Sequence, residues 1–238
     1  GEFGRYLPLS LEDGRQEFAI RYNGELFVDK ASLKLAGRDA ARLLYPGSLY
    51  RYRFGSGDPP EFRENSHATK QSVEKNWLPV VHSAWLDREI HYTETALVAP
   101  LSGEFPKPGG VHGEEDIAAY VRFNIRNTTS IPKTCSLWIA ISPQEQLVLR
   151  ENAVYATARV VPASPVQILH KLSQYEEPRL RCKVDFGHQG TLTLIPYSDE
   201  KTVSHAVPTT LLYQISLAGG EEHDLVLTVP FATPLDPN

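Results

Sequence analysis

Residues 77–101, WLPVVHSAWLDREIHYTETALVAPL, alternate apolar or aromatic side chains with polar ones on both sides of a polar pair, Asp87 and Arg88. This alternation is typical of β-strands that bury one face. A polar pair between two such runs predicts a two-residue turn. The segment is therefore expected to form a long β-hairpin.

With the turn at Asp87 and Arg88, Trp85 lies opposite Ile90 and Ser83 lies opposite Tyr92. One face of the hairpin then carries the following large side chains: Trp77, Trp85, Ile90, Tyr92 and Val98. An aromatic face of this width must be covered by another layer of the protein. We therefore expect the hairpin at the centre of a large sheet.

Period-two alternation continues along the chain and predicts about fifteen strands. The strongest helical candidate, residues 38–44, ends at once at Pro46 and Gly47. Residues 68–75 are polar on both faces, which favours an edge strand or an exposed sheet. No linker-like shift in composition divides the chain, so we expect a single domain over residues 1–238. The predicted fold class is all-β: a large two-layer antiparallel β-sandwich, with about twice the strands of a seven-stranded immunoglobulin module.

Composition and charge exclude two classes of partner. No apolar run approaches the ~20 residues needed to cross a membrane as a helix, so no membrane partner is expected. The chain has 24 basic and 29 acidic residues, a net charge of −5, and no basic stripe. Nucleic-acid binding is therefore not expected either.

Cys135 and Cys182 lie in apolar, strand-like segments and are expected to be buried free thiols rather than a disulfide. Two cysteines cannot make a structural zinc site, and we expect no cofactor. The chain has no methionine, and it begins Gly1-Glu2-Phe3 like a translated cloning site. We expect a domain excised from a longer protein, which leaves its compartment open.

Two short motifs have local meaning. Asn23-Gly24 is a signal for a type I′ hairpin turn. Asn127, Thr128 and Thr129 form an N-glycosylation sequon, a pattern that also arises by chance.

Aromatic residues in alternation offer one candidate binding surface. A sugar ring could stack on a platform formed by Tyr50, Tyr52 and Phe54 beside Trp77 or Trp85, with Arg51, Arg53 and Asp58 at its rim. Aromatic side chains at period two are more often part of a core. Both interpretations stay open at this point.

Polar residues of the central hairpin offer a second candidate. In the expected register His82 and His91 share a face, with their α-carbons about 7–8 Å apart. They lack a third metal ligand, so no metal site is expected. Glu94 shares a face with the tryptophans and could act as a general acid if desolvated. Its alternative is an exposed or ion-paired carboxylate, for example with Arg88. We include His82, His91 and Glu94 with the aromatic residues as the candidate carbohydrate-binding set.

Three stretches together resemble a known family. They are residues 90–98 (IHYTETALV), residues 120–127 (YVRFNIRN, followed by Thr128 and Thr129) and residues 215–229 (ISLAGGEEHDLVLTV). Their order is similar to that of the N-terminal supersandwich domain of large inverting glycoside hydrolases and disaccharide phosphorylases, the maltose and cellobiose phosphorylase and glucoamylase type. The resemblance covers nearly the whole chain, through strand patterns with one or two polar residues each.

The resemblance implies that catalysis takes place in another domain. In that family the catalytic acid and base lie in a separate barrel of α-helices, so this chain is expected to be non-catalytic and to pack on such a domain. Two alternatives remain, a stand-alone carbohydrate-binding module and a mutarotase-like sugar isomerase. The galactose mutarotases of the same fold class use a histidine and a glutamate, but their Asn-His pair before an aromatic run is missing here.

Overall fold

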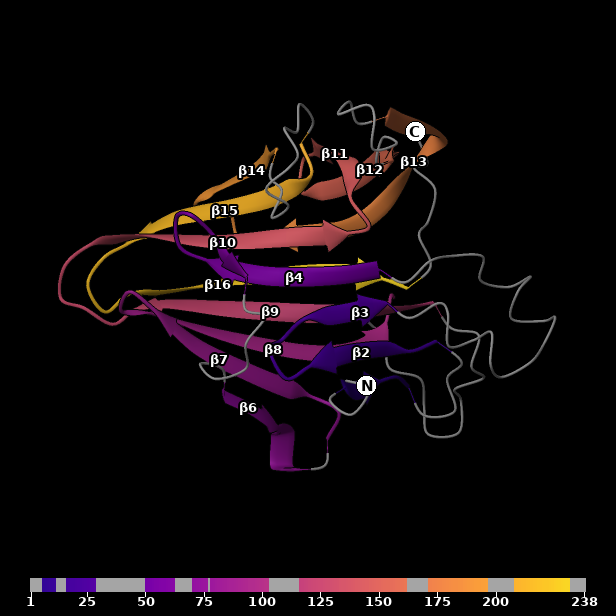
Figure 1. Ribbon diagram of the computed structural model, residues 1–238. Helices are drawn as coiled ribbons and strands as arrows, with labels where there is room; N and C mark the ends of the chain where they lie inside the picture. Colours follow the sequence, from indigo (N-terminus) through magenta and orange to yellow (C-terminus); the bar gives the residue numbers. More distant parts are fainter. Residues whose placement is uncertain are drawn as a thin grey trace.

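The computed structural model shows two β-sheets stacked as layers (Figure 1). It describes residues 6–11, 16–28, 50–62, 70–76, 78–102, 116–161, 171–196 and 208–231. The expected helix over residues 38–44 and the side chain of Trp77 lie outside these ranges. The predicted fold class, an all-β two-layer antiparallel sandwich, is confirmed.

The first sheet has eight strands in the order β1-β2-β3-β4-β10-β15-β14, with β5 paired to β4. Their bounds are β1 (Tyr6–Leu9), β2 (Phe18–Arg21), β3 (Leu26–Val28), β4 (Tyr50–Ser56), β5 (Glu61–Phe62), β10 (Lys133–Ser142), β14 (Thr191–Ile195) and β15 (Thr210–Leu217).

The second sheet also has eight strands, in the order β11-β12-β13-β16-β9-β8-β7-β6. Their bounds are β6 (Lys70–Val73), β7 (Val81–Asp87), β8 (Ile90–Pro100), β9 (Ile117–Asn127), β11 (Glu145–Arg150), β12 (Ala153–Val161), β13 (Lys171–Asp185) and β16 (Glu222–Pro230). A short 3-10 turn, η2 (Glu74–Asn76), links β6 to β7. The polar strand β6 lies at the sheet edge, as its two polar faces predicted.

The core lies between the two sheets and is built from one face of each strand. Alternate residues of β8 and β9 are buried, as period-two alternation requires. An aromatic cluster spans the layers: Phe54 packs edge-on against Phe123 at 4.8 Å, and Trp85 packs edge-on against the same ring at 6.4 Å. Cys135 and Cys182 are buried free thiols, as expected.

The central hairpin forms, but its expected register is wrong by two residues. The turn lies at Arg88 and Glu89, both with positive φ (45° and 68°), and Asp87 pairs with Ile90. Trp85 therefore lies opposite Tyr92, and their rings stack at 5.1 Å with planes 9° apart. A stacked pair of this kind contributes about 0.5–1.5 kcal/mol beyond its buried area. This cross-strand stacking and the contacts to the turn described below stabilise a register that the local sequence did not indicate.

The hairpin between β2 and β3 also forms, with a different turn from the one expected. Gly24 has φ +85°, whereas Asn23 is not among the residues of positive φ, so this is not a type I′ turn. The Gly24 amide donates to the carbonyl of Arg21 at 2.9 Å, and Arg21 N donates to Glu25 O at 2.9 Å. These bonds match a three-residue loop whose last residue is left-handed.

Candidate functional site

A pocket of about 230 Å³ opens at one end of the sandwich. The β7–β8 turn, the β9–β10 connection and the β15–β16 hairpin all lie at this end, at the left of Figure 1. The lining residues that matter for its chemistry come from the β4–β5 turn, the β7–β8 turn and the first residues of β8 and β10: Asp58, Asp87, Arg88, Ile90, Tyr92 and Lys133.

Contacts between the two sheets shape the inner side of the pocket. The hydroxyl of Tyr92, on the second sheet, donates to the carbonyl of Ser136, on the first sheet, at 3.0 Å. Because Tyr92 also stacks on Trp85, its ring has little freedom to move. Ile90 and Tyr92 are buried core residues, exposed by 4% and 1%, and they back the inner side of the pocket.

The β4–β5 turn forms another wall. Gly57 has φ +88°, and a β-carbon built on it would lie 3.2 Å from Oδ2 of Asp87. Glycine therefore lets this turn approach the Asp87 carboxylate closely. The indole Nε1 of Trp138 donates to the Gly57 carbonyl at 2.9 Å and attaches the turn to the first sheet.

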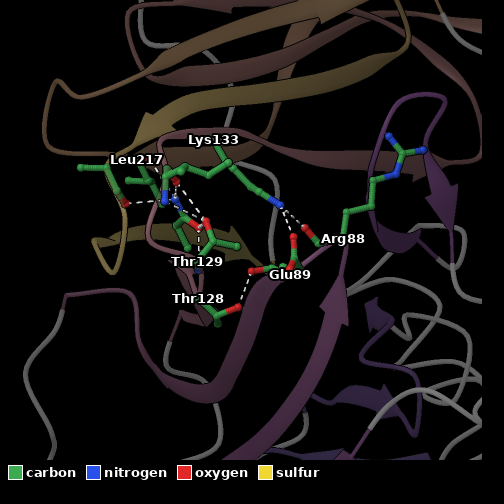
Figure 2. Close-up of polar contacts among 9 residues, drawn as sticks. Arg88, Glu89, Thr128, Thr129, Lys133 and Leu217 are labelled. Atoms are coloured by element: carbon green, nitrogen blue, oxygen red, sulfur yellow. Dashed lines mark hydrogen bonds and ion pairs between the residues drawn. The ribbon is translucent and has the colours of Figure 1, made fainter.

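The β7–β8 turn is held by residues that follow β9 (Figure 2). Thr128 donates to the Glu89 carbonyl twice, from its amide at 3.1 Å and from its hydroxyl at 2.6 Å. Lys133 Nζ donates to the Arg88 carbonyl at 3.1 Å and forms an ion pair with Glu89 Oε2 at 2.5 Å. These bonds stabilise two consecutive residues of positive φ without help from glycine or asparagine.

Asn127 organises the loop that supplies these contacts. Its Nδ2 donates to the carbonyls of Ile131 (2.7 Å), Leu217 (3.2 Å) and Ala218 (3.1 Å). Its Oδ1 accepts from the amide of Thr129 at 3.0 Å and from the Thr129 hydroxyl at 2.8 Å. Since Asn127 is fully buried, the folded chain does not offer the amide of this sequon for glycosylation.

The charges of the pocket are unevenly neutralised. Lys133 is paired with Glu89, and Arg88 Nη2 donates to the Asp58 carbonyl at 3.5 Å. In Figure 2 the Arg88 guanidinium points away from the Lys133–Glu89 pair. Within the described residues, no hydrogen bond or ion pair involves the carboxylate of Asp58 or Asp87. The pocket thus offers hydrogen-bond acceptors in front of a buried inner side, with one arginine near its mouth.

Three members of the predicted carbohydrate-binding set lie inside the core. Tyr52, Trp85 and Glu94 expose 2%, 4% and 0% of their surfaces. A ligand on the outside would not touch them in this structure. Trp77 lies outside the described residues, so the expected aromatic platform is not assembled from the described members. Carbohydrate binding by this set stays a prediction.

Tyr50 and Tyr52 lie beside a buried ion pair that sequence reasoning missed. Arg181 binds the Glu145 carboxylate through Nε (2.5 Å) and Nη2 (2.7 Å), and both residues are about 1% exposed. Arg181 Nη2 also donates to the Tyr50 hydroxyl at 3.1 Å, and its guanidinium lies 4.5 Å from that ring's centroid. Tyr175 donates to Glu145 at 2.5 Å. No local pattern pairs residues 36 positions apart.

The two histidines do not converge. His82 lies opposite Thr95 and His91 lies opposite Leu86, four residues further along β7, so the expected diagonal pair is wrong because the register differs. His82 bonds to Thr95 Oγ1 at 3.0 Å and to Glu74 Oε2 at 2.9 Å. Among the described residues there is no group of three potential metal ligands.

Glu94 shares the buried face with Trp85, as expected, and so lies on the opposite face of the sheet from His82. A histidine–glutamate pair acting on one sugar is therefore not formed by these two residues.

No protein-family model matches this chain, and no curated protein matches it. In the described part of the chain, no helix has the length and apolar character to span a membrane. The fold defines the class of protein: an all-β protein of two large antiparallel sheets packed as a sandwich.

Proposed function

We propose that this chain is a non-catalytic β-sandwich domain of a carbohydrate-active enzyme, of glycoside hydrolase or phosphorylase type, and that it binds carbohydrate at the end pocket. One observation carries this proposal. The pocket places two carboxylates, Asp58 and Asp87, which make no hydrogen bond or ion pair within the described residues, beside the buried core residues Ile90 and Tyr92.

The chemistry of sugars matches this combination. A pyranose ring presents apolar C–H faces, and its hydroxyl groups need hydrogen-bond partners at the rim. Binding sites for small molecules typically place a few polar groups on a mostly apolar surface. Carboxylates accept hydrogen bonds from two neighbouring hydroxyl groups, and bonds to a charged acceptor are roughly twice as strong as neutral ones.

The resemblance to supersandwich domains supports the other half of the proposal, a separate helical catalytic domain as partner. Leu86 and Ile131 are the most exposed large hydrophobic side chains of the described residues, at 61% and 60%. Leu86 precedes the β7–β8 turn and Ile131 lies in the β9–β10 connection, so both belong to the pocket end of the sandwich. Apolar side chains exposed there suit contact with another domain.

Calorimetric titration of the chain with neutral mono- and oligosaccharides tests binding. We expect saturable binding that Asp87→Asn weakens. Asp116→Asn serves as the matched control. Asp116 immediately precedes β9 (Ile117–Asn127), whereas the pocket lies at the Asn127 end of that strand. Absence of binding to every sugar, or equal losses in the two variants, would contradict the proposed site.

Assays for glycoside hydrolysis test the non-catalytic role. We expect the purified chain to release no sugar, because the resemblance assigns the acid and base to another domain. Sugar release that disappears in Glu94→Gln would overturn this half of the proposal.

A further inference from the structure

We propose that the end pocket receives the terminal unit of a saccharide chain, and that this unit is a neutral or amino sugar rather than a uronic acid. This inference rests on the proposed carbohydrate binding and specifies its ligand class.

The size limits the ligand to about one ring. Sites for drug-sized ligands measure roughly 300–1,000 Å³. At about 230 Å³ the pocket is smaller than these. A longer saccharide can place one unit inside, while the remaining units extend into solvent.

The enclosure determines which unit enters. The inner side is closed by the Tyr92–Ser136 hydrogen bond that joins the two sheets. On the side of the β4–β5 turn, the Gly57 backbone approaches Asp87. On the side of β10, Lys133 is tied to the β7–β8 turn. A saccharide chain that passed through the pocket would need a second opening on the inner side, and the protein core occupies that side. The terminal unit is therefore the one that fits.

The charge selects among terminal units. Asp58, Asp87 and Glu89 supply three carboxylates against the two cations Arg88 and Lys133, and the Lys133–Glu89 pair neutralises itself. Two carboxylates and one guanidinium remain to act on a ligand. A uronic acid would add a further negative charge within a few ångströms of Asp87, and like charges at that distance repel. An amino sugar would be attracted for the same reason.

Two comparisons test this inference by calorimetry. The first titrates linear oligosaccharides of increasing length and cyclic ones of the same linkage, with maltohexaose and α-cyclodextrin as one pair. We expect every linear member to bind with the same dissociation constant within about twofold, and the cyclic sugar not to bind. The second compares glucose, glucosamine and glucuronic acid, and the corresponding galactose series. We expect the uronic acid to bind roughly tenfold or more weakly than the neutral sugar at low salt.

A variant separates charge from shape. Asp87→Asn keeps an acceptor oxygen but removes a charge. The ratio of the dissociation constants for the uronic acid and the neutral sugar should therefore fall towards one, while Asp116→Asn should leave this ratio unchanged. Thermal unfolding of both variants checks that they fold. Cyclic sugars that bind as tightly as linear ones would overturn recognition of the chain end and leave carbohydrate binding intact. A uronic acid that binds as tightly as the neutral sugar would overturn the charge selection. No binding at all would overturn both the inference and the proposed function.

Discussion

The carboxylate of Glu94 on β8 lies directly against Gly24 in the β2–β3 turn of the opposite sheet, and it occupies the space that a side chain at position 24 would need. Nearby, Gln71 Nε2 donates to the Arg21 carbonyl at 2.8 Å and to Ser83 Oγ at 3.2 Å. The Gln71 side chain, on the second sheet, thus joins that sheet to the first. Glu94, a candidate general acid in the sequence, is fully buried between the layers, and a catalytic role for it stays a prediction.

Gly24→Ala should destabilise the protein by about 2–4 kcal/mol, because the left-handed φ costs about 1–3 kcal/mol for a residue with a side chain and the new methyl group displaces Glu94. Urea denaturation measures the change. The control is Gly220→Ala, since Gly220 has φ +78° and no heavy atom near its β-carbon position. If both variants lose the same free energy of unfolding, the contact with Glu94 contributes nothing.

Asn127→Ala should cost about 2–4 kcal/mol, because it removes the amide donor from the Leu217 and Ala218 carbonyls at the β15–β16 hairpin and one of the two donors to the Ile131 carbonyl. Thr128→Val keeps the Asn127 cluster and loses only a hydroxyl bond to Glu89, so it should cost less than about 1.5 kcal/mol. Chemical denaturation of both variants gives the comparison. A larger loss for Thr128→Val would show that the turn contact, and not the amide cluster, stabilises this end.

Arg181→Met should destabilise the protein by about 3–5 kcal/mol, because it leaves the Glu145 carboxylate buried without its cation. Arg122→Met is the matched control on another strand. The side chains of Arg122 and Asp224 are 57% and 44% exposed, and such surface pairs contribute less than about 1 kcal/mol. Similar losses in the two variants would rule out burial as the source of the difference.

Stability should fall at alkaline pH through the two cysteines. Burial raises the pKa of the Cys135 thiol from 9.0 to about 11 and that of Cys182 to about 12. A thiol with a raised pKa holds its proton more tightly in the folded chain, so its contribution is complete below pH 9 and is lost as the pH rises towards 11–12.

Urea denaturation between pH 8 and 11 should show this loss, at up to about 1.4 kcal/mol per pH unit for each thiol. The double variant Cys135→Ala with Cys182→Ala is expected to be less stable throughout but to lose stability less steeply. If unfolding free energy falls with pH equally steeply in the original chain and the double variant, the cysteines are not the cause. The tyrosines with raised pKa would then account for the loss of stability. In the native state at pH 8 neither thiol should react with a disulfide reagent.

Several features of the fold followed from local pattern alone. The alternation from Ile90 to Val98 correctly identified the buried face of β8, and the polar character of β6 correctly indicated an edge strand. The burial of Cys135 and Cys182 followed from their apolar neighbours in sequence. Each of these depends on which face of a strand a side chain occupies, and that is determined within a few residues.

The candidate site was less accessible to prediction. Asp58, Asp87 and Arg88 drew attention as turn or rim residues, but nothing in the sequence joined them to Lys133. The strongest type I′ signal, at Asn23 and Gly24, formed another turn, whereas Arg88 and Glu89 took positive φ because Thr128 and Lys133 bind their carbonyls.

What the amino-acid sequence determined by itself is the period of its side chains, and with it the strands, their buried faces and the all-β class. Tertiary structure alone decided the hairpin register, the burial of Glu94 and Arg181, and the pocket at the end of the sandwich. The physical reason is range, because alternation acts between neighbouring residues whereas these ion pairs join distant ones. Lys133 and Glu89, 44 positions apart, meet only when the two sheets stack, and Glu145 and Arg181, 36 positions apart, meet only when β11, β12 and β13 pair within the second sheet.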